Sequence, residues 1–97
     1  MIKQYEGEKF EDLKGLYLID FYADWCGPCK MLGKVLEQLE GINILKINVD
    51  EFEDLAKEYK VMSIPYLLLI KDGKVEKELL GFRSKDDLEK ELDSLKD

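Results

Sequence analysis

The chain has 97 residues, a net charge of −7 and no histidine. This length suits a single domain over residues 1–97 and leaves no room for a second. The acidic balance argues against nucleic acid and anionic membranes as partners. The lack of histidine excludes a Ser-His or Cys-His catalytic pair and removes the usual imidazole ligand of zinc.

The first elements of the chain predict a buried strand with an acid in it. Ile2–Tyr5 is expected as a short edge strand and Glu8–Lys14 as a brief helix. Leu16–Tyr22 is nearly continuous in apolar character, which predicts a central strand. Asp20 interrupts this run and shares a face with Leu18, because side chains alternate along a strand. If both faces of the strand are covered, Asp20 is buried.

A helix, a strand and a second helix are predicted next. Apolar residues at helical spacing predict a helix from about Pro28 to Glu40. Ile42–Val49 is expected as a second apolar strand, interrupted by Lys46. The apolar stripe of Phe52–Tyr59 predicts the next helix. The chain therefore alternates strands and helices up to this point.

The last part of the chain predicts a hairpin and a closing helix. Tyr66–Ile70 is expected as a strong strand, Asp72-Gly73 as a two-residue turn, and Lys74–Leu80 as the returning antiparallel strand. Ser84 is expected to begin the final helix. This order predicts an α/β fold with a mixed, mostly parallel sheet, helices on both faces and an antiparallel edge.

Both cysteines lie in the stretch Trp25-Cys26-Gly27-Pro28-Cys29-Lys30, where a predicted strand leads into a predicted helix. A C-x-x-C motif at such a junction is typical of a thiol–disulfide redox site. Unpaired N–H groups and the helix dipole at a helix N-terminus stabilise a thiolate. Pro28 is tolerated there because the first turn needs no N–H donor. Gly27 leaves room for the backbone of another protein.

Two other interpretations of Cys26 and Cys29 are a structural disulfide and half of a zinc site. Zinc normally takes four ligands, whereas this chain offers two sulfurs and no histidine. We expect a cytoplasmic protein, because no apolar run follows Met1 and the longest apolar run, residues 66–70, is too short to span a bilayer. In a reducing compartment a lone cysteine pair is more often catalytic than structural.

The W-C-G-P-C-K motif matches the thioredoxin active site residue for residue, and the chain resembles the thioredoxin family over nearly its whole length. Further matches are Asp20, six residues before Cys26, and Lys46, Ile64-Pro65, Gly73 and Gly81. Two positions depart from the family. Lys34 replaces a proline that kinks the helix in many members, and Tyr66 follows Pro65 where threonine is common.

The resemblance implies a role for each matched residue. Cys26 is expected to be the nucleophile and Cys29 the resolving cysteine, with Asp20 as proton acceptor and Lys46 tuning Asp20. The peptide bond before Pro65 is expected to be cis. Trp25, outside the apolar strand, is expected on the surface beside the sulfurs. The substrate-binding residues are expected to be Trp25, Gly27, Pro28, Ile64, Pro65, Tyr66 and Gly81.

The implied activity is protein disulfide reduction by a monomer that carries electrons to client proteins and serves cell redox homeostasis. A flavin-containing thioredoxin reductase is the expected partner, and no bound cofactor or metal is expected. Two alternatives remain at this stage. The first is a binding module of the same fold, in which docking matters more than redox chemistry. The second is an oxidase or isomerase, which Pro28 disfavours because more oxidising relatives commonly carry histidine there.

Overall fold

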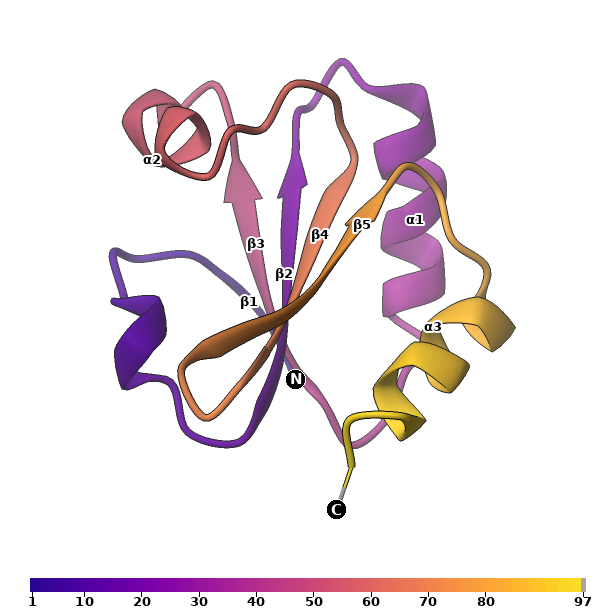
Figure 1. The fold of residues 1–97 in the computed structure, drawn as a ribbon. Coiled ribbons are helices and arrows are strands. Elements are labelled where there is room, and N and C mark those ends of the chain that lie inside the picture. Colours follow the sequence, from indigo (N-terminus) through magenta and orange to yellow (C-terminus); the bar gives the residue numbers. More distant parts are fainter. Residues whose placement is uncertain (97) are drawn as a thin grey trace.

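The computed structural model describes residues 1–96 and places a five-stranded sheet between two layers of helices (Figure 1). The strands are β1 (Ile2–Gln4), β2 (Leu16–Tyr22), β3 (Asn43–Asn48), β4 (Tyr66–Lys71) and β5 (Lys74–Leu80). The helices are η1 (Phe10–Asp12, a 3₁₀ turn), α1 (Gly27–Leu36), α2 (Glu53–Glu58) and α3 (Lys85–Asp93). Helices α1 and α3 lie on one side of the sheet and α2 on the other (Figure 1).

The sheet order is β1-β3-β2-β4-β5. β3 pairs in parallel with β1 and β2, whereas β4 pairs antiparallel with β2 and β5. The predicted mixed sheet is confirmed, but the expectation that parallel pairing predominates is corrected to two pairings of each kind. The reason is visible in Figure 1: α2 and the loop after it stay at the end of the sheet where β3 finishes. β4 therefore starts at that end and runs back.

Side-chain alternation along the strands divides the apolar core into two layers. Leu18 of β2 packs with Leu32 of α1 in the layer beneath α1 and α3. Ile19 of β2 packs with Phe10 of η1 in the layer on the opposite face. Since Asp20 follows Ile19 in the same strand, its side chain points into the α1 layer. The core thus places this carboxyl beneath α1.

Two predicted helices are shorter than expected. The predicted helix Glu8–Lys14 is reduced to η1. The predicted helix Pro28–Glu40 ends at Leu36, because the chain then tightens into i→i+3 hydrogen bonds such as Leu39 N–H to the Leu36 carbonyl at 3.1 Å. The other predicted elements agree with the structure to within one residue at each end. Within residues 1–96, no helix is long and apolar enough to cross a membrane.

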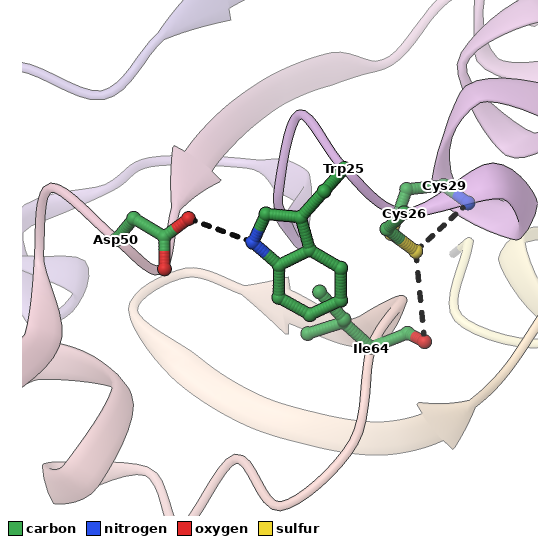
Figure 2. Close-up of a disulfide and its surroundings, with 5 residues drawn as sticks. All are labelled: Trp25, Cys26, Cys29, Asp50 and Ile64. Atoms are coloured by element: carbon green, nitrogen blue, oxygen red, sulfur yellow. Dashed lines mark hydrogen bonds between the residues drawn. A yellow bond between two sulfur atoms is a disulfide. The ribbon is translucent and has the colours of Figure 1, made fainter.

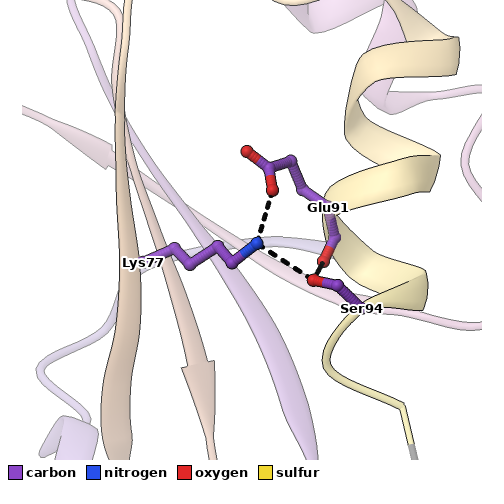
Figure 3. Close-up of polar contacts among 3 residues, drawn as sticks. All are labelled: Lys77, Glu91 and Ser94. Atoms are coloured by element: carbon purple, nitrogen blue, oxygen red, sulfur yellow. Dashed lines mark hydrogen bonds and ion pairs between the residues drawn. The ribbon is translucent and has the colours of Figure 1, made fainter.

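Helix α3 holds the edge strand β5 in place (Figure 3). The Lys77 ammonium of β5 lies 2.5 Å from a Glu91 carboxylate oxygen and donates to the Ser94 hydroxyl at 3.0 Å. The Ser84 side chain accepts from the Asp87 N–H at 3.1 Å, which confirms it as the N-terminal cap of α3. The Lys77 contacts join the middle of β5 to the last turn of α3.

Candidate redox-active site

Cys26 and Cys29 form a disulfide at the N-terminus of α1, with their Cα atoms 5.2 Å apart (Figure 2). Cys26 caps the helix, and its sulfur accepts the Cys29 N–H at 3.2 Å. Pro28 stands in the first turn, where no intrahelical donor is required. Both cysteines are buried while Gly27 and Pro28 are exposed. A thiolate at Cys26 would therefore meet backbone N–H groups and the positive end of the helix dipole.

A loop from the opposite side of the site meets the disulfide. The Cys26 sulfur lies 3.9 Å from the carbonyl oxygen of Ile64 (Figure 2). The Ile64-Pro65 bond is cis, as the family resemblance implies. The carbonyl of Pro65 accepts the Gly81 N–H at 2.9 Å, so the end of β5 is tied to the same loop. The structure thus brings together three segments that are far apart in sequence.

Trp25 lies on the surface, with 71% of its side chain exposed. Its indole N–H donates to the Asp50 carboxylate at 2.9 Å, and Figure 2 shows this edge of the ring directed away from the disulfide. The indole borders a shallow hollow of about 330 Å³ lined also by Val49, Val61, Met62, Ser63 and Ile64. Asp50 and Met62 were not among the expected site residues, because single polar or apolar residues in loops carry no sequence signal of their own.

Asp20 is fully buried, as its position in β2 predicts. Neither oxygen of its carboxylate has a hydrogen-bond partner within the described residues. Burial raises the pKa of Asp20 from 3.8 to about 6, and the positive charge of Lys46 opposes part of this rise. A carboxyl with such a pKa exchanges protons near neutral pH, which suits a proton acceptor on the face of β2 that packs under α1.

Lys46 stands next to Asp20 in the sheet, since the two residues are register partners between β3 and β2. Its side chain is half-buried, and its ammonium lies 4.4 Å from the centroid of the Tyr22 ring. Lys46 therefore acts on Asp20 by charge and contacts the ring of Tyr22 directly. Tyr22 was not among the expected site residues, although it follows Asp20 by two positions and so shares its face of the strand.

The expectation for Tyr66 needs a correction. Its side chain is only 4% exposed and belongs to the core layer on the face opposite Asp20. The cause is strand alternation, because Tyr66 opens β4 as the register partner of Phe21, which points into the same layer. The phenol is therefore not available to a docking protein in this structure. Only the backbone of Tyr66 remains beside Pro65.

A disulfide-forming pair at the start of a helix, on a mixed sheet covered on both faces, defines a thiol–disulfide oxidoreductase. The family model for thioredoxin matches residues 3–94. The thioredoxin of Chlamydia caviae is 47% identical over 94 residues, covering 91% of this chain and 92% of that protein. The thioredoxin of Bacillus subtilis is 48% identical over 84 residues, covering 81% of each chain. The chain belongs to the thioredoxin family.

Solved structures agree with this assignment. A thioredoxin variant from Halobacterium salinarum superposes with a TM-score of 0.87 at 35% identity, covering 99% of this chain and 91% of that chain. The thioredoxin of Nicotiana alata gives a TM-score of 0.85 at 32% identity, covering 99% and 93% of the two chains. The predicted fold and redox-active dithiol are thereby confirmed.

Proposed function

We propose that this protein is a general protein disulfide reductase, a single-domain monomer of the cytoplasm that carries electrons to client proteins. The observation that carries the proposal is the Cys26–Cys29 disulfide at the N-terminus of α1, in contact with the loop of Ile64 and cis-Pro65, while the carboxyl of Asp20 is buried on the face of β2 that packs under the same helix. The activity itself follows from the dithiol, and the position of Asp20 supports a cycle in which both sulfurs react in turn.

The proposed cycle moves two electrons to the client. The Cys26 thiolate attacks one sulfur of a client disulfide, that S–S bond breaks, and a mixed disulfide forms while the other client sulfur leaves as a thiolate and takes up a proton. Cys29 loses its proton to Asp20 and attacks the Cys26 sulfur. The mixed disulfide breaks, the second client sulfur leaves as a thiolate and takes up a proton, and Cys26–Cys29 is left as a disulfide.

Client docking is assigned to the surface around the disulfide. An extended client segment would pair with the backbone at Ile64 and Pro65 as an added strand, a common mode of peptide recognition. The Gly81 N–H donates to the Pro65 carbonyl, and no residue other than its two chain neighbours has an atom within 4 Å of the point that a Cβ on Gly81 would occupy, which leaves space for this segment. Apolar client side chains would enter the hollow beside Trp25.

Regeneration of the dithiol requires two electrons from outside. We assign this step to a flavin-containing thioredoxin reductase, and no cofactor bound to this chain takes part. The fraction of protein in each redox state would follow its reduction potential, and a value of about −270 mV fits a reductase. A value well above about −200 mV would instead favour the oxidase or isomerase alternative.

A trapping experiment tests the cycle. Wild-type protein is expected to reduce insulin with dithiothreitol as electron source. Cys29→Ser is expected to accumulate covalent client complexes that dithiothreitol releases, because the resolving thiol is missing. Cys26→Ser is the matched control and is expected to trap nothing. If wild-type protein leaves insulin oxidised and Cys29→Ser captures no client, the proposed function is wrong.

A further inference from the structure

The ammonium group of Lys46 occupies a slot between β2 and α1. On one side it lies 4.4 Å from the centroid of the Tyr22 ring. On the other side lies Gly33 of α1, where an added Cβ would stand 3.7 Å from the Lys46 nitrogen. A cation over an aromatic face is attracted by the ring quadrupole. The slot therefore has one wall that attracts the ammonium and one wall that has no side chain.

The Tyr22 ring is itself held in place. Its hydroxyl donates to the side-chain oxygen of Gln4 at 3.1 Å. Gln4 belongs to β1 and is the register partner of Lys46 on β3. Three neighbouring strands thus supply the lysine, the ring beneath its charge, and the residue that anchors the ring.

The slot lies beside a carboxyl that has no direct partner. Asp20 pairs in register with Lys46 on one side and with apolar Leu67 on the other. Neither Asp20 oxygen receives a hydrogen bond within the described residues. On α1, above Asp20, Cys29 is disulfide-bonded, and Lys30 and Lys34 are exposed. Lys46 is therefore the charged group of this structure that stabilises the Asp20 carboxylate.

We propose that the Tyr22 ring keeps the Lys46 ammonium under α1, within electrostatic range of Asp20, and so acts as a positioning residue for the proton acceptor. This inference rests on the proposed function, which assigns that role to Asp20. Without the ring, the ammonium would move to solvent. Lysine has a long flexible stem and a strongly hydrated head, whereas approach to fully buried Asp20 would require the charge to lose its water.

Loss of the ring has a definite consequence for Asp20. With the ammonium in solvent, water screens its attraction for the carboxylate, so the charged form of Asp20 is favoured less. The pKa of Asp20 then rises, and proton transfer from Cys29 shifts to higher pH. Tyr22→Phe keeps the ring face and removes only the hydroxyl, so it is the matched control for Tyr22→Leu.

The test is a carbon-13 NMR titration of the Asp20 carboxyl in the disulfide form, which requires no catalytic activity. Tyr22→Leu is expected to raise the pKa of Asp20 by about half a unit, and Tyr22→Phe to raise it clearly less, because the ring face remains although the hydrogen bond that anchors it to Gln4 is lost. Lys46→Met is expected to raise it further. In the Lys46→Met background, Tyr22→Leu is expected to change nothing, because the ring then has no cation to hold.

The inference is overturned if Tyr22→Leu leaves the pKa of Asp20 unchanged or lowers it, or raises it equally in the Lys46→Met background. The wild-type protein provides a second check, since the ε-methylene protons of Lys46 should be shifted upfield by the ring. Random-coil positions for these protons would also overturn it. The pH midpoint of single-turnover client release should follow the titration. Failure of wild-type protein to reduce insulin would instead contradict the proposed function and leave the titration intact.

Discussion

The phenol of Tyr66 donates a hydrogen bond to the Glu78 carboxylate, on the face of the sheet opposite Asp20. Its ring stacks on Phe21 with the centroids 5.9 Å apart. Burial, together with the hydrogen bond to Glu78, raises the pKa of Tyr66 to about 12, so the phenol remains a donor at neutral pH. The residue that directly follows cis-Pro65 is thus fixed by β2 and β5.

Substitutions at Tyr66 should change stability more than client binding. Tyr66→Phe removes one hydrogen bond and keeps the stacked ring, so we expect a loss of about 1 kcal/mol in the free energy of unfolding. Tyr66→Thr also removes the ring and should cost about 3 kcal/mol. The KM for insulin should stay within about twofold for Tyr66→Phe. Urea unfolding measures the stability of both variants, and insulin kinetics measure the KM of Tyr66→Phe. A raised KM with unchanged stability would show that the phenol contacts the client.

The orientation of the Tyr66 side chain could not be predicted from the sequence alone. Side-chain alternation within β2 correctly predicted that Asp20 lies on the opposite face of the strand from Ile19 and Phe21. The C-x-x-C pattern correctly predicted the position of the disulfide. Both predictions depend only on local spacing in the sequence. The side to which Tyr66 points depends on its register with Phe21, which is a contact distant in sequence. The contact of Lys46 with Tyr22 likewise depends on two strands that are distant in sequence.

The buried carboxyl of Asp20 should make stability depend on pH. Its pKa of about 6, raised from 3.8 by burial, means that the folded state binds more protons than the unfolded state between these values. The free energy of unfolding should therefore fall as pH rises through this window. The contribution of Asp20 to the free energy of unfolding should be about 3 kcal/mol smaller above pH 7 than below pH 3.8.

Asp20→Asn should remove this dependence. The amide carries no charge, so the variant should be more stable than wild type by about 2 kcal/mol at pH 7, after allowance for an amide without partners. At pH 3.5 the Asp20 carboxyl is protonated in the folded protein, so only the cost of the unpartnered amide remains and the variant should be less stable than wild type by about 1 kcal/mol. Client release should slow, because Cys29 loses its proton acceptor. Chemical unfolding at both pH values measures the first effect, and equal midpoints at pH 7 would contradict the burial of a charged Asp20.

The hydrogen bond from Trp25 to Asp50 should support client docking. In Asp50→Ala the indole loses its acceptor and can turn away from the hollow that it borders. We expect the KM for insulin to rise about threefold, which corresponds to about 0.7 kcal/mol, with kcat nearly unchanged. Glu51→Ala is the matched control, because it removes the same charge from an exposed neighbouring position. An equal rise in KM for Glu51→Ala would assign the effect to charge alone.

The same substitution at two glycines should have opposite effects on stability. Gly33 lies inside α1, and its backbone is not in the left-handed conformation that favours glycine. A Cβ added there would make an ordinary contact with the Lys46 nitrogen at 3.7 Å. Gly33→Ala should therefore stabilise the protein by about 0.5–1 kcal/mol. Gly73 has φ +82° and would drive a Cβ into the backbone of Glu11. Gly73→Ala should cost more than about 1 kcal/mol. Thermal unfolding measures both, and a loss of stability in Gly33→Ala would mean that the slot for the Lys46 ammonium does not tolerate a methyl group.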